Sequence, residues 1–339
     1  MVFPKYSFKS AKVCASITLL FSCFLTQAET SNSWPVFAAQ LSDGILQICE
    51  TQHCELNVLD SQTLEAILNQ HPLSLEIFEA LTLSEYELLV SSAAISSSPE
   101  AADAHSKTLV LEMTTSWRGI PVDDFNITSE FEGSVNEAAE LQINAWVDRV
   151  QNDGVFEAQR IYQKIGASDY HQHMQLPEKI GDFIFTETAL YHDPMQGSIS
   201  RYIHPLFADA VVDVSVYPVS PFIHKTQGAA PLESEMAIEK SHIQQLILQA
   251  QLDDYQISDI QSTQFTSTLG EMKGLSMEVA LQTRVDPIYS TQFLFTKNDK
   301  FIKVTGNLPK TMMLALVQES IGQITVPQES TFMQSMRQQ

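Results

Sequence analysis

The sequence is poor in glycine and has none of the common catalytic signatures. Only 12 glycines occur in 339 residues, so few backbone positions would let a phosphate approach closely. A GxSxG elbow, a Walker loop, a GxGxxG turn and an HExxH helix are all missing. These absences exclude the hydrolases, kinases and dinucleotide-binding enzymes built on those motifs, and we expect no cofactor and no metal.

Basic residues are also scarce. Lysine and arginine number 19 against 41 aspartates and glutamates, which gives a formal net charge of -22. Such a surface repels phosphate backbones and anionic lipid, so we expect no nucleic-acid partner. Hydrophobic residues make up 44% of the chain, and its length exceeds what one core usually holds. Two domains are therefore expected.

Long hydrophobic runs are missing except near the start. Residues 13–25 are apolar, follow three lysines and precede small residues that end at Ala28. This order is typical of an export signal, so we expect residues 1–28 to be removed and the mature chain to be periplasmic or secreted in a bacterium. The run is about half of the roughly 20 residues that span a bilayer, so no transmembrane segment is expected in the mature chain. The alternative is a lipoprotein anchored at Cys23, although bulky Phe21 fits that signal poorly.

Cysteine is rare, and only Cys49 and Cys54 lie beyond the leader. Exported chains meet oxidising conditions, so this even pair predicts a disulfide. The apolar flanks at residues 45–48 and 56–59 would form a hairpin whose loop the bridge closes. Free thiols are one alternative, and a metal held by both thiols and His53 is another, but the spacing differs from the usual two-residue zinc knuckle.

The first predicted unit covers residues 29–133. A helix should begin at Asp60 or Ser61, and residues 29–40 should form a loose leader to the unit. Period-two alternation and β-prone residues predict strands. These strands are expected at residues 86–95, 107–117 and 123–131. The sequence therefore predicts that residues 29–133 form a small α+β unit with an antiparallel sheet.

A helical connector is expected at residues 134–175. Ser134 and Glu137 have the spacing of a capping box, which marks a helix start. His171 and His173 near its end share a face in an extended chain, so a metal site is conceivable there. We interpret them instead as two exposed histidines in a polar linker.

The second predicted domain covers residues 176–325 and opens with a β-meander at 182–219. Residues 212–217 alternate strictly between valine and polar side chains, as a half-buried antiparallel strand requires. A long helix at 232–254, further strand-like runs and a closing helix from Pro309 follow. The polar residues 326–339 are expected to form a flexible, frayed tail.

This order of elements resembles a known fold. Its carriers are Leu176–Pro177 at the opening, the segment from Gly197 to Tyr202 after the turn, and the long crossing helix. The segment resembles the PsbP-like fold of photosystem accessory proteins and Ran-binding release factors. The resemblance implies an antiparallel sheet covered by helices, an α/β/α sandwich, and a role in binding or assembly. Fold alone does not fix function, and no functional residue carries over.

One polar constellation is a candidate ligand-binding site. Tyr191 and His192 stand in the meander's first loop, and Arg201, Tyr202 and His204 stand on the next strand. If the two runs pair as a hairpin, these groups could converge at one rim and bind an anionic small ligand or exchange protons. Turn chemistry and cross-strand pairing explain the same residues equally well.

Two functional hypotheses follow. The preferred one is an exported, non-catalytic binding or assembly module whose partner is an envelope protein. The alternative is a small-ligand carrier or an enzyme that uses the 191–204 rim.

Overall fold

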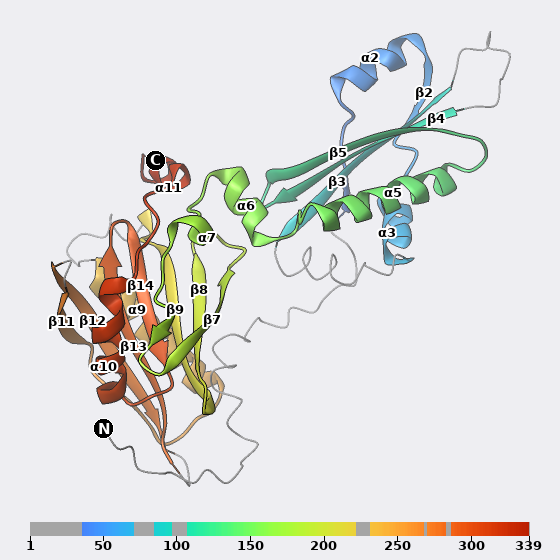
Figure 1. Cartoon of the computed structure of the whole chain (residues 1–339). Coiled ribbons are helices and arrows are strands. Elements are labelled where there is room, and N and C mark those ends of the chain that lie inside the picture. The colour runs from blue at the N-terminus through green and yellow to red at the C-terminus, as the bar shows by residue number, and fades with distance from the viewer. Residues whose placement is uncertain are drawn as a thin grey trace. The chain divides into compact units, whose positions relative to one another are not determined.

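The computed structural model describes residues 36–70, 85–96, 107–221, 231–267, 270–282 and 286–338. The predicted leader, with Ala28 and Cys23, lies outside these ranges. The chain forms two compact units that divide between Lys164 and Ile165 (Figure 1). Each unit has its own sheet, and each is described by itself below.

The N-terminal unit is built on a five-stranded mixed sheet in the order β1-β3-β4-β5, with β2 also paired to β3. The predicted strands are confirmed within a few residues, because alternating and β-branched residues occupy them. The strands are β1 (Val36–Ala38), β2 (His53–Leu56), β3 (Tyr86–Ser96), β4 (Lys107–Trp117) and β5 (Ile120–Phe131). β1 runs parallel to β3, so part of the expected loose leader is an ordered edge strand.

Helices cover this sheet, and one of them changes an expectation. Asp60 caps α3 (Ser61–Gln70), since its carboxylate accepts a hydrogen bond from the Thr63 amide at 2.7 Å. α5 (Val135–Asn152) is capped by Ser134 as predicted, but it packs on the sheet rather than serving as a connector. Its buried side includes Gln142, which donates to the backbone carbonyl of Leu109 at 3.1 Å.

The hairpin predicted around the cysteines is wrong. The first flank is a helix, α2 (Asp43–Thr51), and only the second flank is a strand, β2. The apolar residues of the first flank fit one face of a short helix as well as they fit a strand, so the sequence pattern was ambiguous. The disulfide is confirmed, because Cys49 and Cys54 are joined at a Cα–Cα distance of 5.4 Å.

Short helices α6 (Ala158–Ile165) and α7 (Tyr170–His173) follow α5. Asp169 caps α7 by accepting hydrogen bonds from the amides of His171 and Gln172. Both histidines of the predicted linker are exposed.

The C-terminal unit is α+β, as predicted, and carries a nine-stranded sheet that is antiparallel throughout its pairings. The order is β10-β12-β13-β14-β9-β8-β7-β6, and β11 also pairs with β12. The strands are β6 (Lys179–Ile180), β7 (Phe183–Leu190), β8 (Ser198–His204), β9 (Phe207–Pro218), β10 (Tyr255–Ile257), β11 (Gln261–Ser267), β12 (Gly270–Leu281), β13 (Ile288–Lys297) and β14 (Lys300–Gly306).

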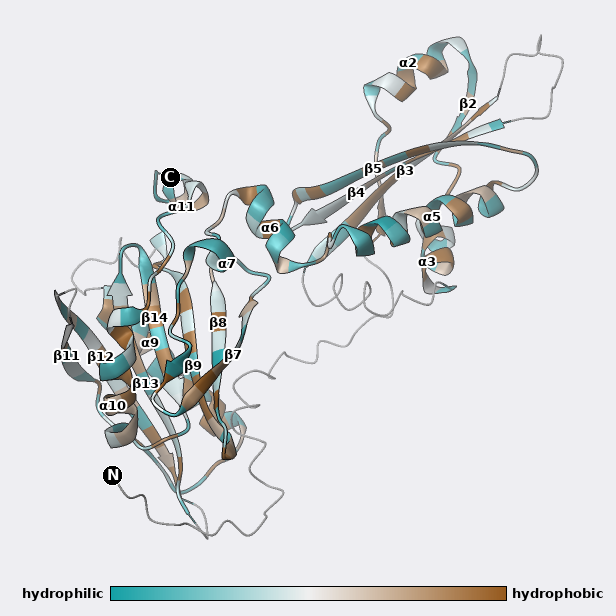
Figure 2. Cartoon of the chain, in the orientation of Figure 1, coloured by the Kyte–Doolittle hydropathy of each residue, from teal (hydrophilic) through white to brown (hydrophobic). Residues whose placement is uncertain are grey.

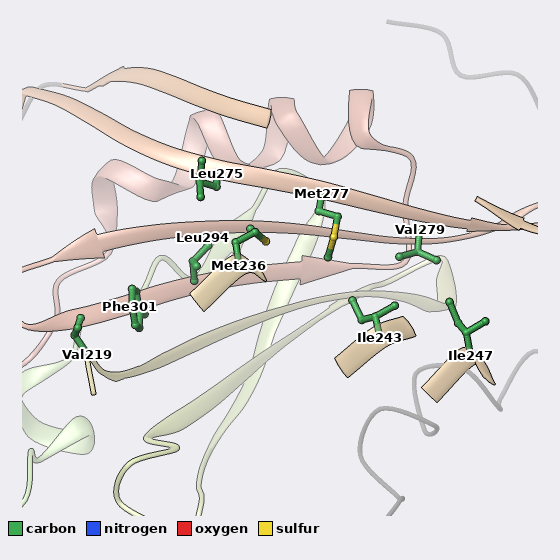
Figure 3. Packing of buried hydrophobic residues seen from close by; sticks show 9 residues of the cluster. All are labelled: Val219, Met236, Ile243, Ile247, Leu275, Met277, Val279, Leu294 and Phe301. Atoms are coloured by element: carbon green, nitrogen blue, oxygen red, sulfur yellow. The ribbon is translucent and has the colours of Figure 1, made fainter. Parts of the chain in front are cut away.

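Two helices lie on opposite faces of this sheet: α9 (Pro231–Gln249) behind it and α10 (Lys310–Ser320) in front of it (Figure 1). The stripe of Met236, Ile243 and Ile247 on α9 packs on side chains of the central strands (Figure 3). The sheet side of this core comprises Val219, Leu275, Met277, Val279, Leu294 and Phe301. Figure 2 shows the corresponding brown, hydrophobic stretches along the strands.

The expected flexible tail contains an ordered helix, α11 (Thr331–Gln338), after a short 3-10 turn η1 (Ile321–Gln323). Met333 is fully buried, and Arg337 donates to the carbonyl of Val219 at 3.1 Å. Thr331 donates to the carbonyl of Gly166 at 3.2 Å. These long-range contacts hold a segment whose own composition is polar, which is why the sequence suggested fraying.

Candidate functional site

The predicted rim is built by the meander of β7, β8 and β9. In the turn between β7 and β8, the carboxylate of Asp193 accepts from the Met195 amide at 2.9 Å. Gly197 closes the turn at φ +66, where a Cβ would overlap the backbone of Val216. Glycine is therefore required at this close approach of two strands. The turn fixes Tyr191 and His192 at one end of the hairpin.

Arg201 lies in the middle of β8, directly opposite Asp213 of β9. Its Nε and Nη2 donate to the two carboxylate oxygens of Asp213 at 2.9 and 3.1 Å. This fork geometry is the strong, bidentate form of an arginine–carboxylate pair. The hydrogen bonds to Asp213 raise the pKa of Arg201 above its usual value. The Arg201 side chain is 39% exposed, but the Nε and Nη2 donors of its guanidinium are already occupied.

Tyr191 belongs to the same neighbourhood. Burial raises the pKa of its phenol, and the negative charges of Asp213 and Glu239 raise it further, while the charge of Arg201 lowers it. The phenol therefore stays protonated at neutral pH. It can donate a hydrogen bond from this position but is a poor base.

A second set of polar residues lies on the same face, beside α9. Lys303 of β14 binds Glu239 of α9 at 2.7 Å, and Tyr217 of β9 donates to Glu235 at 2.9 Å. The Lys303 ammonium also lies 5.7 Å from the centroid of the Tyr217 ring. Burial is the main reason that the pKa of Glu235 is raised. These pairs fasten α9 to the polar half of the sheet face.

Sequence reasoning did not find this second set. The alternation of β9 correctly placed Asp213 and Tyr217 on the wetter face, and Glu235 and Glu239 are one turn apart on a helix. The partners Lys303 and Glu239, however, are 64 residues apart in the sequence. Their meeting depends on strand order, which no local pattern reveals.

Two of the predicted rim residues lie elsewhere. Tyr202 projects to the opposite face of the sheet, is fully buried, and donates to the carbonyl of Pro177 at 2.8 Å. His204 stands at the far end of β8 from Tyr191, because six residues of strand extend about 20 Å. The five residues therefore do not converge on one rim. Tyr191 and His192 lie at the turn, and Arg201 lies farther along β8 on the face of the sheet that α9 covers.

A surface patch instead forms around His204. Its ring lies between those of Phe183 and Phe207, at centroid distances of 5.3 and 4.8 Å, and its Nδ1 accepts from the Leu206 amide at 3.1 Å. The side chain of Phe207 is 50% exposed, and that of Leu206 is 81% exposed. Phe185 is also exposed at 37% and stacks edge-on against Tyr202. We call Phe185, His204, Leu206 and Phe207, together with the buried Phe183 that packs against the His204 ring, the aromatic patch.

The polar groups can do little chemistry as arranged. Arg201 is already paired with Asp213, and Lys303 with Glu239. Glu187 and Glu235 add further negative charge beside these two cations. An anionic ligand would have to displace Asp213 from Arg201. In the described ranges, no three His, Cys, Asp or Glu side chains gather as a metal site would require. None of the helices in those ranges combines the length and hydropathy needed to cross a membrane.

Comparisons with known proteins give fold-level likeness only. No family model matches the chain, and no curated protein matches it. The solution structure of cyanobacterial PsbP from Synechocystis is 12% identical, covers 45% of this chain and 92% of its own, and has a TM-score of 0.29. The apo structure of the immunity protein TplEi from Pseudomonas aeruginosa is 11% identical, covers 69% of this chain and 72% of its own, and has a TM-score of 0.24. Likeness at these values assigns neither a family nor a function.

Proposed function

We propose that this chain is an exported, non-catalytic binding or assembly module that docks to a partner protein of the bacterial envelope through the aromatic patch. The observation that carries the proposal is the exposure of Leu206 and Phe207 on a strand connection. Large apolar side chains exposed together mark interaction surfaces, and aromatic residues are enriched in them.

The patch is held rigidly, which suits docking. Ring contacts on both sides of His204 and its bond from the Leu206 amide fix the short β8–β9 connection. A preformed apolar surface loses little conformational entropy on binding, so more of its burial appears as affinity. The aromatic patch therefore fits a partner with a complementary apolar surface.

Two features support export. The leader of residues 1–28 has the composition of a signal, and the Cys49–Cys54 bridge is of the kind that persists in oxidising compartments. A soluble periplasmic or secreted protein is proposed, and lipidation of Cys23 is the alternative. Mass spectrometry of the mature N-terminus separates them, since a lipid-bearing Cys23 would replace a free residue 29.

We further propose that residues 176–325 adopt the PsbP-like arrangement. The support is the element order: a meander of β6 to β9, the crossing helix α9, five further strands and the closing helix α10. This is an argument from topology, and it adds nothing to the choice of partner.

The small-ligand hypothesis makes a different prediction about the surface. It requires Arg201 to release Asp213 and bind an anion, and it makes the aromatic patch irrelevant. A set of three variants therefore distinguishes the two hypotheses. They are the patch variant Leu206→Ser/Phe207→Ser, the control Ile238→Ser/Leu248→Ser, and Arg201→Ala.

The control removes two similarly exposed apolar side chains from α9, which are 57% and 71% exposed. Each tagged variant is purified from the envelope of the source cell, and co-purifying proteins are quantified by mass spectrometry. A partner that wild type and control retain and the patch variant loses supports the proposal. Retention by the patch variant contradicts it, and loss with Arg201→Ala alone favours the rim.

A further inference from the structure

Acidic side chains border the aromatic patch. Because β7, β8 and β9 pair antiparallel in that order, the β6–β7 turn and the β8–β9 connection lie at the same end of the sheet. Asp182 occupies that turn, and Asp209 follows Phe207 by two positions in β9. Glu178 lies beside Phe185, whose amide donates to the Glu178 carbonyl at 3.0 Å. All three acidic residues are exposed, and we call them the acidic border.

The charge of the acidic border is not neutralised by the part of the chain that the structure describes. Among those residues, none of the three carboxylates forms an ion pair with a lysine, arginine or histidine. One exposed cation, Lys179, adjoins Glu178 in the sequence and offsets part of the charge. The surface around the patch therefore keeps a surplus of negative charge.

This charge decides between the possible occupants of the patch. An exposed apolar surface can be covered by a second copy of the chain, by lipid or by a different protein. A second copy carries the same net charge of -22 and the same carboxylates, so its approach is opposed. Anionic membrane lipid is repelled for the same reason. A protein whose own apolar surface is bordered by lysine and arginine is attracted instead.

We propose that the aromatic patch docks a basic protein, whose lysine and arginine side chains pair with the acidic border around a contact centred on Leu206 and Phe207. This inference rests on the proposed function and specifies the chemistry of the partner. An apolar centre enclosed by a polar border is the usual anatomy of a protein interface. The net charge of the whole chain also speeds the encounter with a cationic partner.

The sign of the salt dependence separates this partner from the other occupants. At an ionic strength of about 0.1 M, the screening length is about 10 Å, so added salt weakens the attraction between exposed charges. Docking of a basic protein should therefore weaken as salt is added. Pairing of two copies, or contact with anionic lipid, should strengthen, because salt then screens a repulsion.

Photo-crosslinking measures this dependence. The full mature chain, with a photoactivatable phenylalanine analogue at Leu206, is mixed with envelope proteins of the source cell in non-ionic detergent. The yield of the adduct should fall about five-fold or more between about 50 mM and about 300 mM sodium chloride. Mass spectrometry of the adduct should place the crosslink beside lysine or arginine residues of the partner. A yield that stays constant or rises with salt, or an adduct between two copies of the chain, overturns the proposal.

Charge reversal tests the acidic border itself. Asp182→Lys/Asp209→Lys should lower the adduct yield about five-fold or more at low salt, since two attractions become repulsions. The matched control is Asp253→Lys/Glu271→Lys, which makes the same change in net charge. Both control residues are exposed and lie beside β10 or on β12, at the other end of the strand order from β7.

The control should lower the yield less than about two-fold, because its charges are distant from the contact. Equal yields from the border variant and wild type, or an equal loss in both variants, overturn the proposal. Circular dichroism identical to that of wild type shows that both variants are folded. The salt series on the wild-type surface decides the matter even if a variant does not fold.

Two further results separate this inference from the proposed function. An adduct whose yield responds neither to salt nor to the border variant overturns the basic partner but leaves docking through the patch intact. No adduct at any salt concentration overturns both. Sedimentation of the chain with phosphatidylglycerol vesicles, abolished by Leu206→Ser/Phe207→Ser, would make lipid the occupant and would also overturn the proposal.

Discussion

A buried ion pair at the β13–β14 turn fastens the C-terminal helix, and its removal should destabilise the C-terminal unit alone. Lys300 is fully buried, and its ammonium lies 2.6 Å from both carboxylate oxygens of Asp299. Arg337 of α11 lies 3.7 Å from the same carboxylate. Burial lowers the pKa of Lys300, while the hydrogen bonds to Asp299 raise it.

Asp299→Asn leaves the lysine buried without its counter-ion. Breaking a buried pair by removing one partner typically costs about 3 to 5 kcal/mol, and we expect about 3 kcal/mol here. Lys300→Met leaves Asp299 with Arg337 and should cost less. The double variant Asp299→Asn/Lys300→Met should recover most of the loss, because no buried charge remains at the turn.

The loss should also depend on pH. Without Asp299 the pKa of Lys300 falls further below its unfolded value, so the folded state binds fewer protons than the unfolded state between the two pKa values. Stability then increases as the pH rises through the folded pKa. The deficit of Asp299→Asn relative to wild type should therefore shrink as the pH rises toward the unfolded pKa of lysine, about 10.4.

Tryptophan provides an internal control for this experiment. All three tryptophans, Trp34, Trp117 and Trp146, precede residue 165, so their fluorescence reports on the N-terminal part of the chain. Urea unfolding followed by circular dichroism should show a weakened transition in Asp299→Asn, with the fluorescence transition unchanged. A loss under about 1 kcal/mol, or a double variant no more stable than the single one, would refute the reasoning.

Three further changes have defined outcomes. Tyr202→Phe should cost about 1 kcal/mol in urea unfolding, because the buried carbonyl of Pro177 loses its donor; an unchanged midpoint would contradict this. Gly197→Ala should cost more than about 2 kcal/mol in the same assay, since the turn needs positive φ and has no room for a Cβ; a neutral effect would contradict the tight turn. Reduction of the Cys49–Cys54 disulfide should lower the free energy of unfolding of the N-terminal unit by at most about 2 kcal/mol, because the closed loop is short. Tryptophan fluorescence measures this change. A shift of the C-terminal transition would show that the signals are assigned to the wrong units.

The sequence predicted elements whose own residues decide their structure. β3 and β4 lie within a residue of their predicted positions, since alternating apolar side chains leave few other solutions. The sequence also predicts the cap of α5 at Ser134, because a capping box depends only on neighbouring residues. α2 was mistaken for a strand because a short apolar run fits both structures.

Long-range contacts explain the other differences. α11 is held by bonds from Thr331 and Arg337 to residues more than 100 positions away, so its polar composition gave no sign of order. The same limit applies to the site. The alternation of β8 places Arg201 and Tyr202 on opposite faces of the sheet. The ion pair between Arg201 and Asp213, however, depends on the register between β8 and β9, which the sequence pattern does not reveal.

The most direct test of the proposed function is site-specific photo-crosslinking in living cells of the source organism. A photoactivatable phenylalanine analogue is placed at Leu206 in the aromatic patch or, as control, at the similarly exposed Leu248 on α9. We predict a discrete crosslinked partner from position 206 and none from position 248. No adduct at position 206, or the same adducts at both positions, would contradict docking through the patch.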